Sequence, residues 1–273
     1  MTILVTGVTG LVGRRLVPRL IEAGRECRVL MRSYNNPPDN VEVVIGDMLE
    51  PATLARAVRG VSAVIHLAAV FRTHDQQLIW KSNLDGTRNL LKAVREHAPQ
   101  SRFILASTGR IYETDLPRSR PGREDDPVQP THAYPASKLA AEQLVRESKL
   151  TWAIIRFPFV YGDGDGHIEM LPAHAGTFKW HPASRMSTIH HRDVATAMTL
   201  ALDGVMDGRV VNVADDLPAS MLELLALAGG RMEASAEPLN NPWASQYDTA
   251  LARSLGFKPT VRTVYAAAQQ GII

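Results

Sequence analysis

The sequence predicts a doubly wound α/β fold, in which helices cover both faces of a mostly parallel β-sheet. Short apolar runs alternate with longer segments of helical character, and short loops join them. The apolar runs are nearly continuous, as strands buried on both faces require. A helix between two strands returns the chain to the edge where it started, so strand–helix–strand repetition builds a parallel sheet. The expected strands are Ile3–Val5, Cys27–Met31, Val41–Ile45, Ala63–Leu67, Phe103–Ala106, Trp152–Arg156 and Val210–Val213.

Helices are expected between these strands, and a small lobe is expected after the sixth strand. Residues 162–187 are rich in Gly, Pro and His without a clear period, so we expect an irregular segment there. This predicts a dinucleotide-binding sheet domain of residues 1–157 and 188–215, and a substrate-binding lobe of residues 158–187 and 216–273, with about two or three short helices in its tail. The expected helices are Leu11–Ala23, Pro51–Val58, Leu78–His97, one after Tyr134, and Arg192–Leu202.

The composition is that of an ordinary globular protein. The chain has 273 residues, 45% hydrophobic and 21% charged, which is enough for a sizeable core. A net charge of +2 gives no reason to expect a nucleic-acid or membrane partner. The longest apolar run, residues 61–70, is half of the roughly 20 residues that span a membrane. The sequence opens without a secretory signal pattern, and Cys27 is its one cysteine, so we expect a cytoplasmic protein without disulfides.

Three glycines at the end of the first strand predict a dinucleotide site. Gly7, Gly10 and Gly13 directly follow that strand and open the first helix. A diphosphate needs backbone N–H groups and the partial positive charge of a helix N-terminus. Glycine lets the phosphate approach without a Cβ in the way. The spacing is G-x-x-G-x-x-G rather than the more general G-x-G-x-x-G.

This glycine segment, Thr6-Gly7-Val8-Thr9-Gly10-Leu11-Val12-Gly13, resembles the short-chain dehydrogenase/reductase superfamily in its extended branch, the NAD-dependent epimerase/dehydratase family. Further motifs resemble that family and follow in the family's order, which makes the resemblance specific. They are Gly46-Asp47-Met48, His66-Leu67-Ala68-Ala69, Asn83-Leu84-Asp85-Gly86-Thr87, Ile189-His190-His191-Arg192-Asp193-Val194-Ala195 and Asn212-Val213.

The resemblance implies a nicotinamide cofactor, NADP or NAD, bound to a Rossmann fold. The acidic turn after the third strand would contact the adenine, and the motif after the fourth strand would line the cofactor. The implied cofactor-binding residues are Gly7, Thr9, Gly10, Leu11, Val12, Gly13, Arg32, Asp47, Met48, Leu67, Ala68, Ala69, Asn83, Tyr134, Lys138, Phe157 and Val160.

Tyr134 and Lys138 form a Y-x-x-x-K motif that we expect to transfer the proton. Four residues make about one helical turn, so the phenol and the ammonium lie on one face of the helix. A free tyrosine has a pKa of about 10 and is a poor base near neutral pH, but a neighbouring ammonium favours the phenolate. Tyr134 would exchange a proton with the substrate oxygen while hydride passes to or from the nicotinamide. The resemblance also assigns the ribose hydroxyls to Lys138.

A hydroxyl at the end of the fifth strand should complete the catalytic set. Residues 106–112 resemble the family's S-S/T-x-x-V-Y, in which the catalytic hydroxyl lies four residues before the tyrosine. That position is Thr108, which would hydrogen-bond the substrate oxygen where charge develops. Ser107 is its neighbour, and both hydroxyls could instead merely cap the strand end.

An arginine after the second strand favours NADP(H). An NAD site places Asp or Glu at the end of this strand, where the acid binds the ribose 2′-hydroxyl. The family's spacing puts that acid at Met31, and Arg32 follows it. Arginine can bind a 2′-phosphate bidentately, so we expect NADP(H) to be preferred, with NAD(H) still possible.

Two departures from the family pattern bear on the substrate. The family's sugar-nucleotide enzymes usually have R-P-x-N-V-Y-G after the sixth strand, and Phe159 replaces that asparagine here. They also tend to have arginine at the position of Met186, whereas this chain has Arg185 one step before it. We therefore expect a compact small-molecule substrate other than a nucleotide-diphosphate sugar. Its expected contacts are Thr108, Phe159, His167 and Arg185.

Other functions remain open from the sequence. The chain could be a nucleotide-sugar epimerase or dehydratase, with Arg185, Lys179 or His181 supplying the missing charge. A non-catalytic NADP-sensing regulator is less favoured, because such relatives usually lack the tyrosine or the lysine. No metal site is expected, because the histidines have no cysteine partner and no H-E-x-x-H spacing.

The family also implies a possible homodimer, formed by the helices that carry N-x-x-G-T and Y-x-x-x-K. Apolar residues on these two helices are candidates for such an interface, unless they pack on the sheet. The candidates are Leu90, Leu91, Val94, Leu139, Leu144 and Val145.

Overall fold

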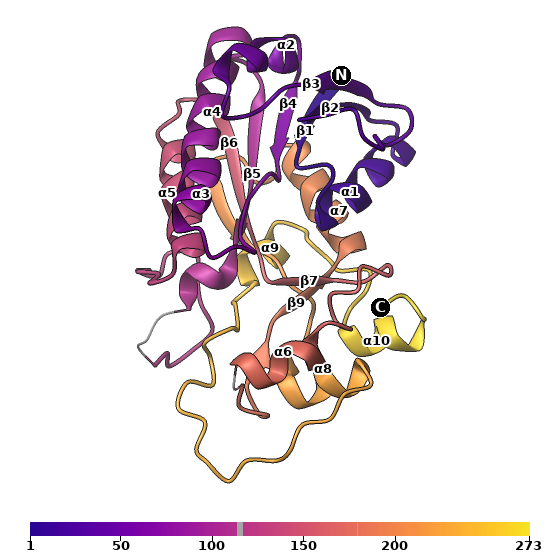
Figure 1. The fold of residues 1–273 in the computed structure, drawn as a ribbon, viewed down its shortest axis with the longest axis vertical. Helices are drawn as coiled ribbons and strands as arrows, with labels where there is room; N and C mark the ends of the chain where they lie inside the picture. Colours follow the sequence, from indigo (N-terminus) through magenta and orange to yellow (C-terminus); the bar gives the residue numbers. More distant parts are fainter. Residues whose placement is uncertain (114–116, 179) are drawn as a thin grey trace.

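The computed structural model describes residues 1–113, 117–178 and 180–273. Its main sheet has seven strands, all paired in parallel, in the order β10-β6-β5-β4-β1-β2-β3 (Figure 1). The chain order reverses between β1 and β4, where doubly wound sheets bind their ligands. The predicted fold class is confirmed. The strands are β1 Thr2–Thr6, β2 Glu26–Met31, β3 Glu42–Ile45, β4 Ala63–His66, β5 Arg102–Thr108, β6 Thr151–Phe157 and β10 Arg209–Asn212.

Helices cover both faces of the sheet, and neighbouring strand residues point to opposite faces. Ile3 and Val5 of β1 join a core with α1 and α7, whereas Leu4 joins a second core with α2, α4 and α5. Figure 1 shows α4 and α5 on one side of the sheet and α1 and α7 on the other. The bounds are α1 Leu11–Glu22, α2 Leu54–Val58, α4 Gly86–His97, α5 Ala133–Arg146 and α7 His191–Leu202.

Most of the residues proposed from the sequence as dimer contacts are buried between α4, α5 and the sheet. Leu139 and Leu144 are partly buried against the apolar clusters beneath α5. The other four are buried and are core residues rather than interface residues, because α4 and α5 turn their apolar faces to the sheet. These four are Leu90, Leu91, Val94 and Val145.

The helix expected over Leu78–His97 consists of three pieces. It begins as α3, Gln76–Trp80, where the side chain of Asp75 caps the first turn by accepting from the Leu78 N–H. A π-helical turn, Lys81–Asp85, follows and leads into α4. Such turns insert one extra residue and often mark functional sites. Here the turn contains Asn83, whose contacts are described below.

A small lobe lies below the sheet domain in Figure 1 and has its own apolar cluster, which includes Tyr161, Ile168 and Leu224. The segment expected to be irregular contains a helix of eight residues, with Pro172 in its first turn. An element this short spans about two turns, so no period is visible in its sequence. The lobe elements are β7 Phe159–Tyr161, α6 Leu171–Phe178, β8 Arg185–Met186, β9 Thr188–His190, β11 Ala219–Ser220, α8 Met221–Leu227 and α10 Val264–Gln269.

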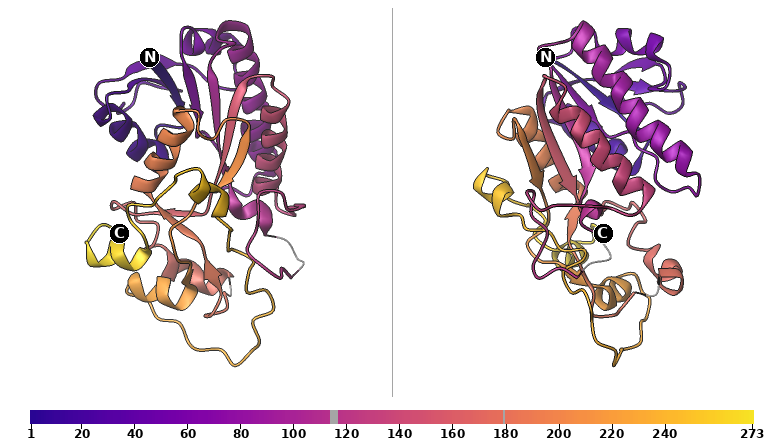
Figure 2. Two further views of the ribbon diagram at one scale, coloured as in Figure 1. Left: turned by 180° about the vertical axis from the view of Figure 1, so that it is seen from behind. Right: turned by 90° about the vertical axis from the view of Figure 1, so that its left-hand side faces the viewer.

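The lobe and the sheet domain exchange segments more than the sequence predicted. Strand β7 pairs in parallel with β9, and β8 pairs antiparallel with β11. The tail, assigned wholly to the lobe from sequence, crosses back through α9, Ala250–Ser254, so that Ala252 and Phe257 join the core beside α7. Figure 2 shows the tail running between the two parts. Asp193 of α7 fixes this crossing by accepting from the backbone N–H groups of Thr260 and Val261.

Within the described residues, no helix is long and apolar enough to cross a membrane. The same residues contain no group of three or more His, Cys, Asp or Glu side chains placed to hold a metal ion.

Candidate active site

The glycine turn between β1 and α1 has the shape that a diphosphate requires. Gly7 has φ +74°, and a Cβ on it would lie 2.6 Å from the Ala68 nitrogen. A Cβ on Gly13 would lie 2.3 Å from the Gly7 oxygen, so these two glycines allow β1, α1 and the loop after β4 to pack closely. Gly10 differs, because a Cβ there would meet nothing closer than 3.3 Å. The space over Gly10, at the N-terminus of α1, is where an anion would be bound.

His66 at the end of β4 is a structural residue that ties β1 to α4. It is fully buried, and its Nδ1 and Nε2 lie 2.7 Å and 2.9 Å from the hydroxyls of Thr6 and Thr87. Thr87 donates its own proton to the Asn83 carbonyl, so His66 Nε2–H must donate to Thr87 and Nδ1 must accept from Thr6. Burial, helped by the charge of Lys138, lowers the pKa of His66 to about 3, so the ring is neutral.

Both the oxygen and the nitrogen of the Asn83 side-chain amide are hydrogen-bonded, and these bonds fix the loop after β4. Its Oδ1 accepts from the Val70 N–H, and its Nδ2 donates to the Val70 carbonyl and to the Ser137 hydroxyl. Ser137 in turn donates to the Tyr134 carbonyl. This predicted cofactor residue therefore fixes the loop after β4 against the first turn of α5, and it acts on a ligand through the groups that it positions.

Thr108 and Tyr134 meet at the carboxyl edge of β5, as the sequence predicts for the catalytic pair. The Thr108 hydroxyl accepts from the Arg110 N–H, and it lies near enough to the Tyr134 phenol to lower the pKa of that phenol. Ser107 points the other way and donates to Glu142 Oε1 at 2.5 Å. The two neighbouring hydroxyls are thus separated by strand alternation, with Thr108 beside the tyrosine and Ser107 in the core.

Burial raises the pKa of the Tyr134 phenol, while the positive charge of Arg110 and the hydrogen bond from Thr108 act in the opposite direction. The sequence assigned the opposing charge to Lys138, but the charge that lowers the Tyr134 pKa in the structure is that of Arg110, from the 3-10 turn Gly109–Tyr112. Lys138 is 2% exposed, and burial lowers its pKa to about 8 against the opposing charge of Glu142. No hydrogen-bond acceptor for its ammonium is found in the described part of the chain, so the ammonium is available to a ligand.

A buried ion pair supports α5 one turn below Lys138. Glu142 receives both Nε and Nη2 of Arg156, at 3.0 Å and 2.7 Å, and the two side chains are 1% and 2% exposed. The remaining Arg156 nitrogen donates to the Tyr112 hydroxyl, which donates to Asn212. A desolvated pair with its hydrogen bonds satisfied holds its elements in one arrangement. Motif reasoning missed Glu142, although an arginine in the otherwise apolar β6 signals a buried partner.

Aromatic rings and one arginine connect the Tyr134 side chain to the lobe. The Phe71 ring lies 5.2 Å from the Tyr134 ring, and the Arg72 guanidinium lies 5.0 Å from the Phe71 ring centroid. Arg72 Nη2 reaches His167 Nε2 at 2.7 Å, and the His167 ring stacks on Phe159 at 4.3 Å. Phe71 and Arg72 belong to no motif, so the sequence did not single them out.

The adenosine end of the expected site has no acid at the end of β2. Met31, at the position where NAD sites have Asp or Glu, is 4% exposed and packs in the core. Arg32 follows it and is exposed. Asp47 binds its own turn, accepting from the Leu49 N–H, and the Met48 carbonyl accepts from the Asn89 amide, which docks this turn on α4.

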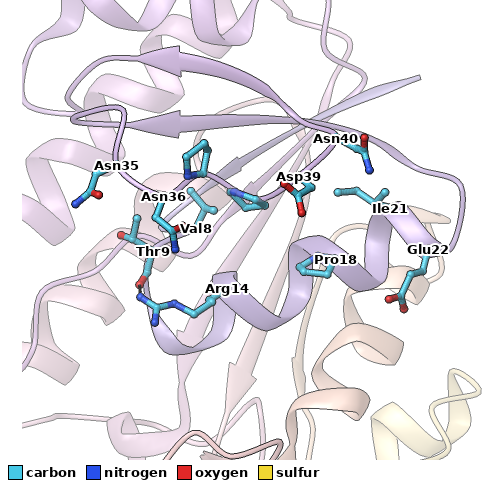
Figure 3. A pocket seen from close by; sticks show the side chains of 12 residues that line it. Val8, Thr9, Arg14, Pro18, Ile21, Glu22, Asn35, Asn36, Asp39 and Asn40 are labelled. Atoms are coloured by element: carbon cyan, nitrogen blue, oxygen red, sulfur yellow. Dashed lines mark hydrogen bonds between the residues drawn. The ribbon is translucent and has the colours of Figure 1, made fainter.

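A pocket of about 610 Å³ lies between α1 and the loop after β2. Figure 3 shows the Arg14 side chain extending from α1 toward Thr9, and its Nη2 donates to the Thr9 carbonyl at 3.0 Å. The residues that line this pocket are Val8, Thr9, Arg14, Pro18, Ile21, Glu22, Asn35, Asn36, Pro37, Pro38, Asp39 and Asn40.

The remaining residues predicted to bind the cofactor or the substrate lie in the sheet core or in the lobe. Phe157 is buried in the core beside α7, and Val160 accepts from His167 through its carbonyl. Arg185 donates to the Pro218 carbonyl and lies near Glu223 within the lobe. His181 bonds the Glu237 carbonyl, and Lys179 lies outside the described residues.

Comparison with known proteins decides the family. Residues 3–214 match the NAD dependent epimerase/dehydratase family. The chain belongs to this family. It is 32% identical over 208 residues to ceramide reductase of Caulobacter vibrioides, an alignment that covers 71% of this chain and 58% of that protein. The chain thus spans less than two thirds of this relative's length.

Two further relatives cover more of the chain. The 4-hydroxy-2-methyl-3-oxo-4-farnesyl-3,4-dihydroquinoline-1-oxide ketoreductase of Stigmatella aurantiaca is 29% identical over 258 residues, which are 89% of this chain and 77% of that protein. The crystal structure of a short-chain dehydrogenase/reductase superfamily protein from Agrobacterium tumefaciens, with bound NAD, has a TM-score of 0.82 and 26% identity. It covers 99% of this chain and 95% of that one.

The epimerase/dehydratase family match ends at Ala214. It therefore includes the glycine turn, Thr108, and α5 with Tyr134 and Lys138. The tail from Asp215 onward, with α8 and α10 of the lobe, lies beyond the matched residues.

Proposed function

We propose that this chain is an NADP(H)-preferring oxidoreductase that interconverts a ketone and a secondary alcohol, with Thr108, Tyr134 and Lys138 as its catalytic residues. One observation carries the proposal. At the carboxyl edge of β5, the Thr108 hydroxyl lies beside the Tyr134 phenol, while the neighbouring hydroxyl of Ser107 is bound to Glu142 in the core. The buried ammonium of Lys138 lies one helical turn from Tyr134, where it can serve both a ligand and the phenol.

The residues present fit a nicotinamide dinucleotide. The glycine turn admits a diphosphate at the N-terminus of α1, since one atom alone, the Gly7 oxygen, would lie within 4 Å of a Cβ on Gly10, and Lys138 offers an ammonium to the ribose hydroxyls. When bound, the nicotinamide ring supplies or accepts the hydride. Asn83 keeps the loop after β4 and the start of α5 in register, so that Tyr134 faces the same cleft.

In this proposal, Tyr134 is the residue that exchanges a proton with the substrate oxygen. Because burial raises its pKa, the phenol keeps its proton at neutral pH and is ready to donate it to a developing alkoxide. Thr108 donates to the same substrate oxygen and stabilises the charge there. In the oxidation direction the phenol must first lose its proton, which the charge of Arg110 favours.

The choice of NADP(H) rests on the surroundings of β2. Met31 offers no acceptor to a ribose hydroxyl, whereas Arg14 lines the pocket beside the glycine turn and the exposed Arg32 follows β2 directly, so both can offer charge to a 2′-phosphate. We expect NADP(H) to have at least a tenfold higher kcat/KM than NAD(H), and the substitution Arg32→Asp to reverse much of this ratio. Steady-state kinetics with both cofactors measures it. A tenfold preference of the native chain for NAD(H) contradicts the proposal.

The proposed substrate has an apolar body and no nucleoside diphosphate. Phe159 stacks on His167 and Met186 packs in the lobe cluster, so neither position offers a polar contact to a sugar nucleotide. Arg185 is already bonded within the lobe. The names of the two relatives, a ceramide reductase and a farnesyl-dihydroquinoline ketoreductase, agree with an apolar substrate.

Thermal-shift measurements with UDP-, GDP- and dTDP-sugars in the presence of NADP⁺ test this substrate class. We expect no rise in melting temperature beyond that given by NADP⁺ alone. A concentration-dependent rise accompanied by turnover would instead show that the chain is a nucleotide-sugar epimerase or dehydratase.

A further inference from the structure

Arg72 connects the two sides of the cleft. It belongs to the loop after β4, whose backbone is fixed at Val70 by the Asn83 amide. Its guanidinium reaches His167, which follows β7 on the lobe side. The segment that carries His167 is fixed as well, since Asp165 accepts from the His167 N–H and pairs with the buried His191. Two anchored segments therefore meet through one arginine.

His167 holds Arg72 without neutralising it. Arginine only donates, so His167 Nε2 accepts from Arg72, and its Nδ1–H donates to the Val160 carbonyl at 2.7 Å. Burial and the charge of Arg72 both lower the pKa of His167, which keeps the ring neutral. The imidazole positions the guanidinium and leaves its positive charge in place.

Arg72 also differs from the other cations of the cleft in having no acid beside it. Arg110 is paired with Glu113 at 2.9 Å, and Glu142 lies one turn from Lys138. Across residues 1–113, 117–178 and 180–273, no carboxylate forms an ion pair with Arg72. Its remaining contact is the face of Phe71, which itself lies against Tyr134.

We propose that Arg72 is the substrate's anion-binding residue, and that the substrate is a hydroxy or keto compound that carries a carboxylate on an apolar body. A planar carboxylate matches the guanidinium fork bidentately. The body would lie against Phe71, because this ring contacts both Arg72 and Tyr134. The Phe71 ring would then lie between the carboxylate, bound at Arg72, and the carbon that reacts beside Tyr134. Only the identification of this ligand as the substrate rests on the proposed oxidoreductase function.

Matched carboxylates and amides test this inference by binding rather than turnover. The probes are phenylacetate with phenylacetamide, and cyclohexanecarboxylate with its amide, titrated calorimetrically into the protein with saturating NADP⁺. The wild type should bind each carboxylate roughly 10- to 100-fold more tightly than its amide, as a charge-assisted pair provides. In Arg72→Gln that ratio should fall to near one. Arg95→Gln, on the exposed side of α4, is the matched control and should keep the wild-type ratio.

Several outcomes would overturn the inference. These are a ratio near one in the wild type, no binding of either carboxylate at millimolar concentration, or an undiminished ratio in Arg72→Gln. A separate titration with NADPH and NADP⁺ alone distinguishes this failure from failure of the proposed function. A protein that binds no cofactor but still prefers carboxylates through Arg72 would refute the oxidoreductase and retain the anion site.

Discussion

The two sides of the cleft are built in different ways. On the sheet side, His66, Asn83 and Glu142 are buried, and each has its polar atoms bonded to fixed partners on neighbouring elements. On the lobe side, the exposed Arg72 meets His167 through a single hydrogen bond, and the His167 ring stacks on Phe159.

We infer that the sheet side holds the residues proposed to react, whereas the lobe side selects the substrate. A reaction that moves a proton at Tyr134 needs side chains held in one place, and the buried bonds of the sheet side provide that. On the lobe side Arg72 is held by one hydrogen bond to His167 and one ring contact with Phe71, so substitutions there should leave the proposed catalytic residues in place. The family match does not follow this division, because it covers the sheet side and also includes β7, α6, β8 and β9 of the lobe.

The largest expected effect on stability comes from breaking the buried pair of the sheet side. Glu142→Ala leaves the Arg156 charge buried and unpaired, which typically costs about 3–5 kcal/mol of unfolding free energy. The exposed Glu147, the C-cap residue of α5, gives a matched control, since Glu147→Ala should change stability by less than about 0.5 kcal/mol. Urea denaturation measures both. Equal, small effects would mean that the ion pair does not hold α5.

A pH-dependent effect is expected where the lobe joins the sheet domain. Asp215 Oδ2 accepts from Tyr161 and Thr188, its Oδ1 has no partner in the described part of the chain, and burial raises its pKa to about 7. The fold therefore favours the protonated acid. Its contribution to stability is present at low pH and is lost as pH rises through about 7.

Asp215→Asn mimics the neutral acid, so the variant should gain stability over the wild type as pH rises. We expect the difference in unfolding free energy between variant and wild type to grow by roughly 2 kcal/mol from pH 5 to pH 8. Denaturant titrations at the two pH values measure the change. A difference that is the same at both pH values would show that the carboxyl titrates normally.

The glycine turn allows a smaller and sharper comparison. Gly13→Ala forces a Cβ to within 2.3 Å of the Gly7 oxygen and should destabilise the fold by about 1–3 kcal/mol. Gly10→Ala meets nothing closer than 3.3 Å, so it should cost less than about 1 kcal/mol but weaken NADP(H) binding at least tenfold. Unfolding curves and fluorescence titration with NADPH separate the two effects. Normal NADPH affinity in Gly10→Ala would place the diphosphate elsewhere.

The sequence predicts the sheet side well because its signals are local. Buried strands appear as apolar runs, and the glycine turn and Y-x-x-x-K are short motifs whose spacing is set by one turn or one helix. The π-helical turn at Asn83 was not predicted, because one inserted residue barely changes the helical period. The family motif already favoured Thr108 over Ser107, and the structure adds that Ser107 is bound to Glu142 in the core.

The lobe side could not be predicted to the same extent. Its strands have two or three residues, too few to show a period. Its main contact joins Arg72 to His167, which are 95 positions apart in the chain, and neither belongs to a motif. The return of Ala252 and Phe257 to the core beside α7 likewise depends on packing over long sequence distances.

Tyr134→Phe tests the central claim most directly, because the ring keeps its packing and loses only the oxygen that carries the proton. The reaction measured is NADPH oxidation with the best ketone acceptor that the wild type reduces in a panel of apolar ketones. We expect kcat to fall by roughly 10²–10⁴-fold, while the Kd for NADPH stays within about twofold of the wild type. Activity of Tyr134→Phe within a few-fold of the wild type would contradict the account and remove Tyr134 from the mechanism.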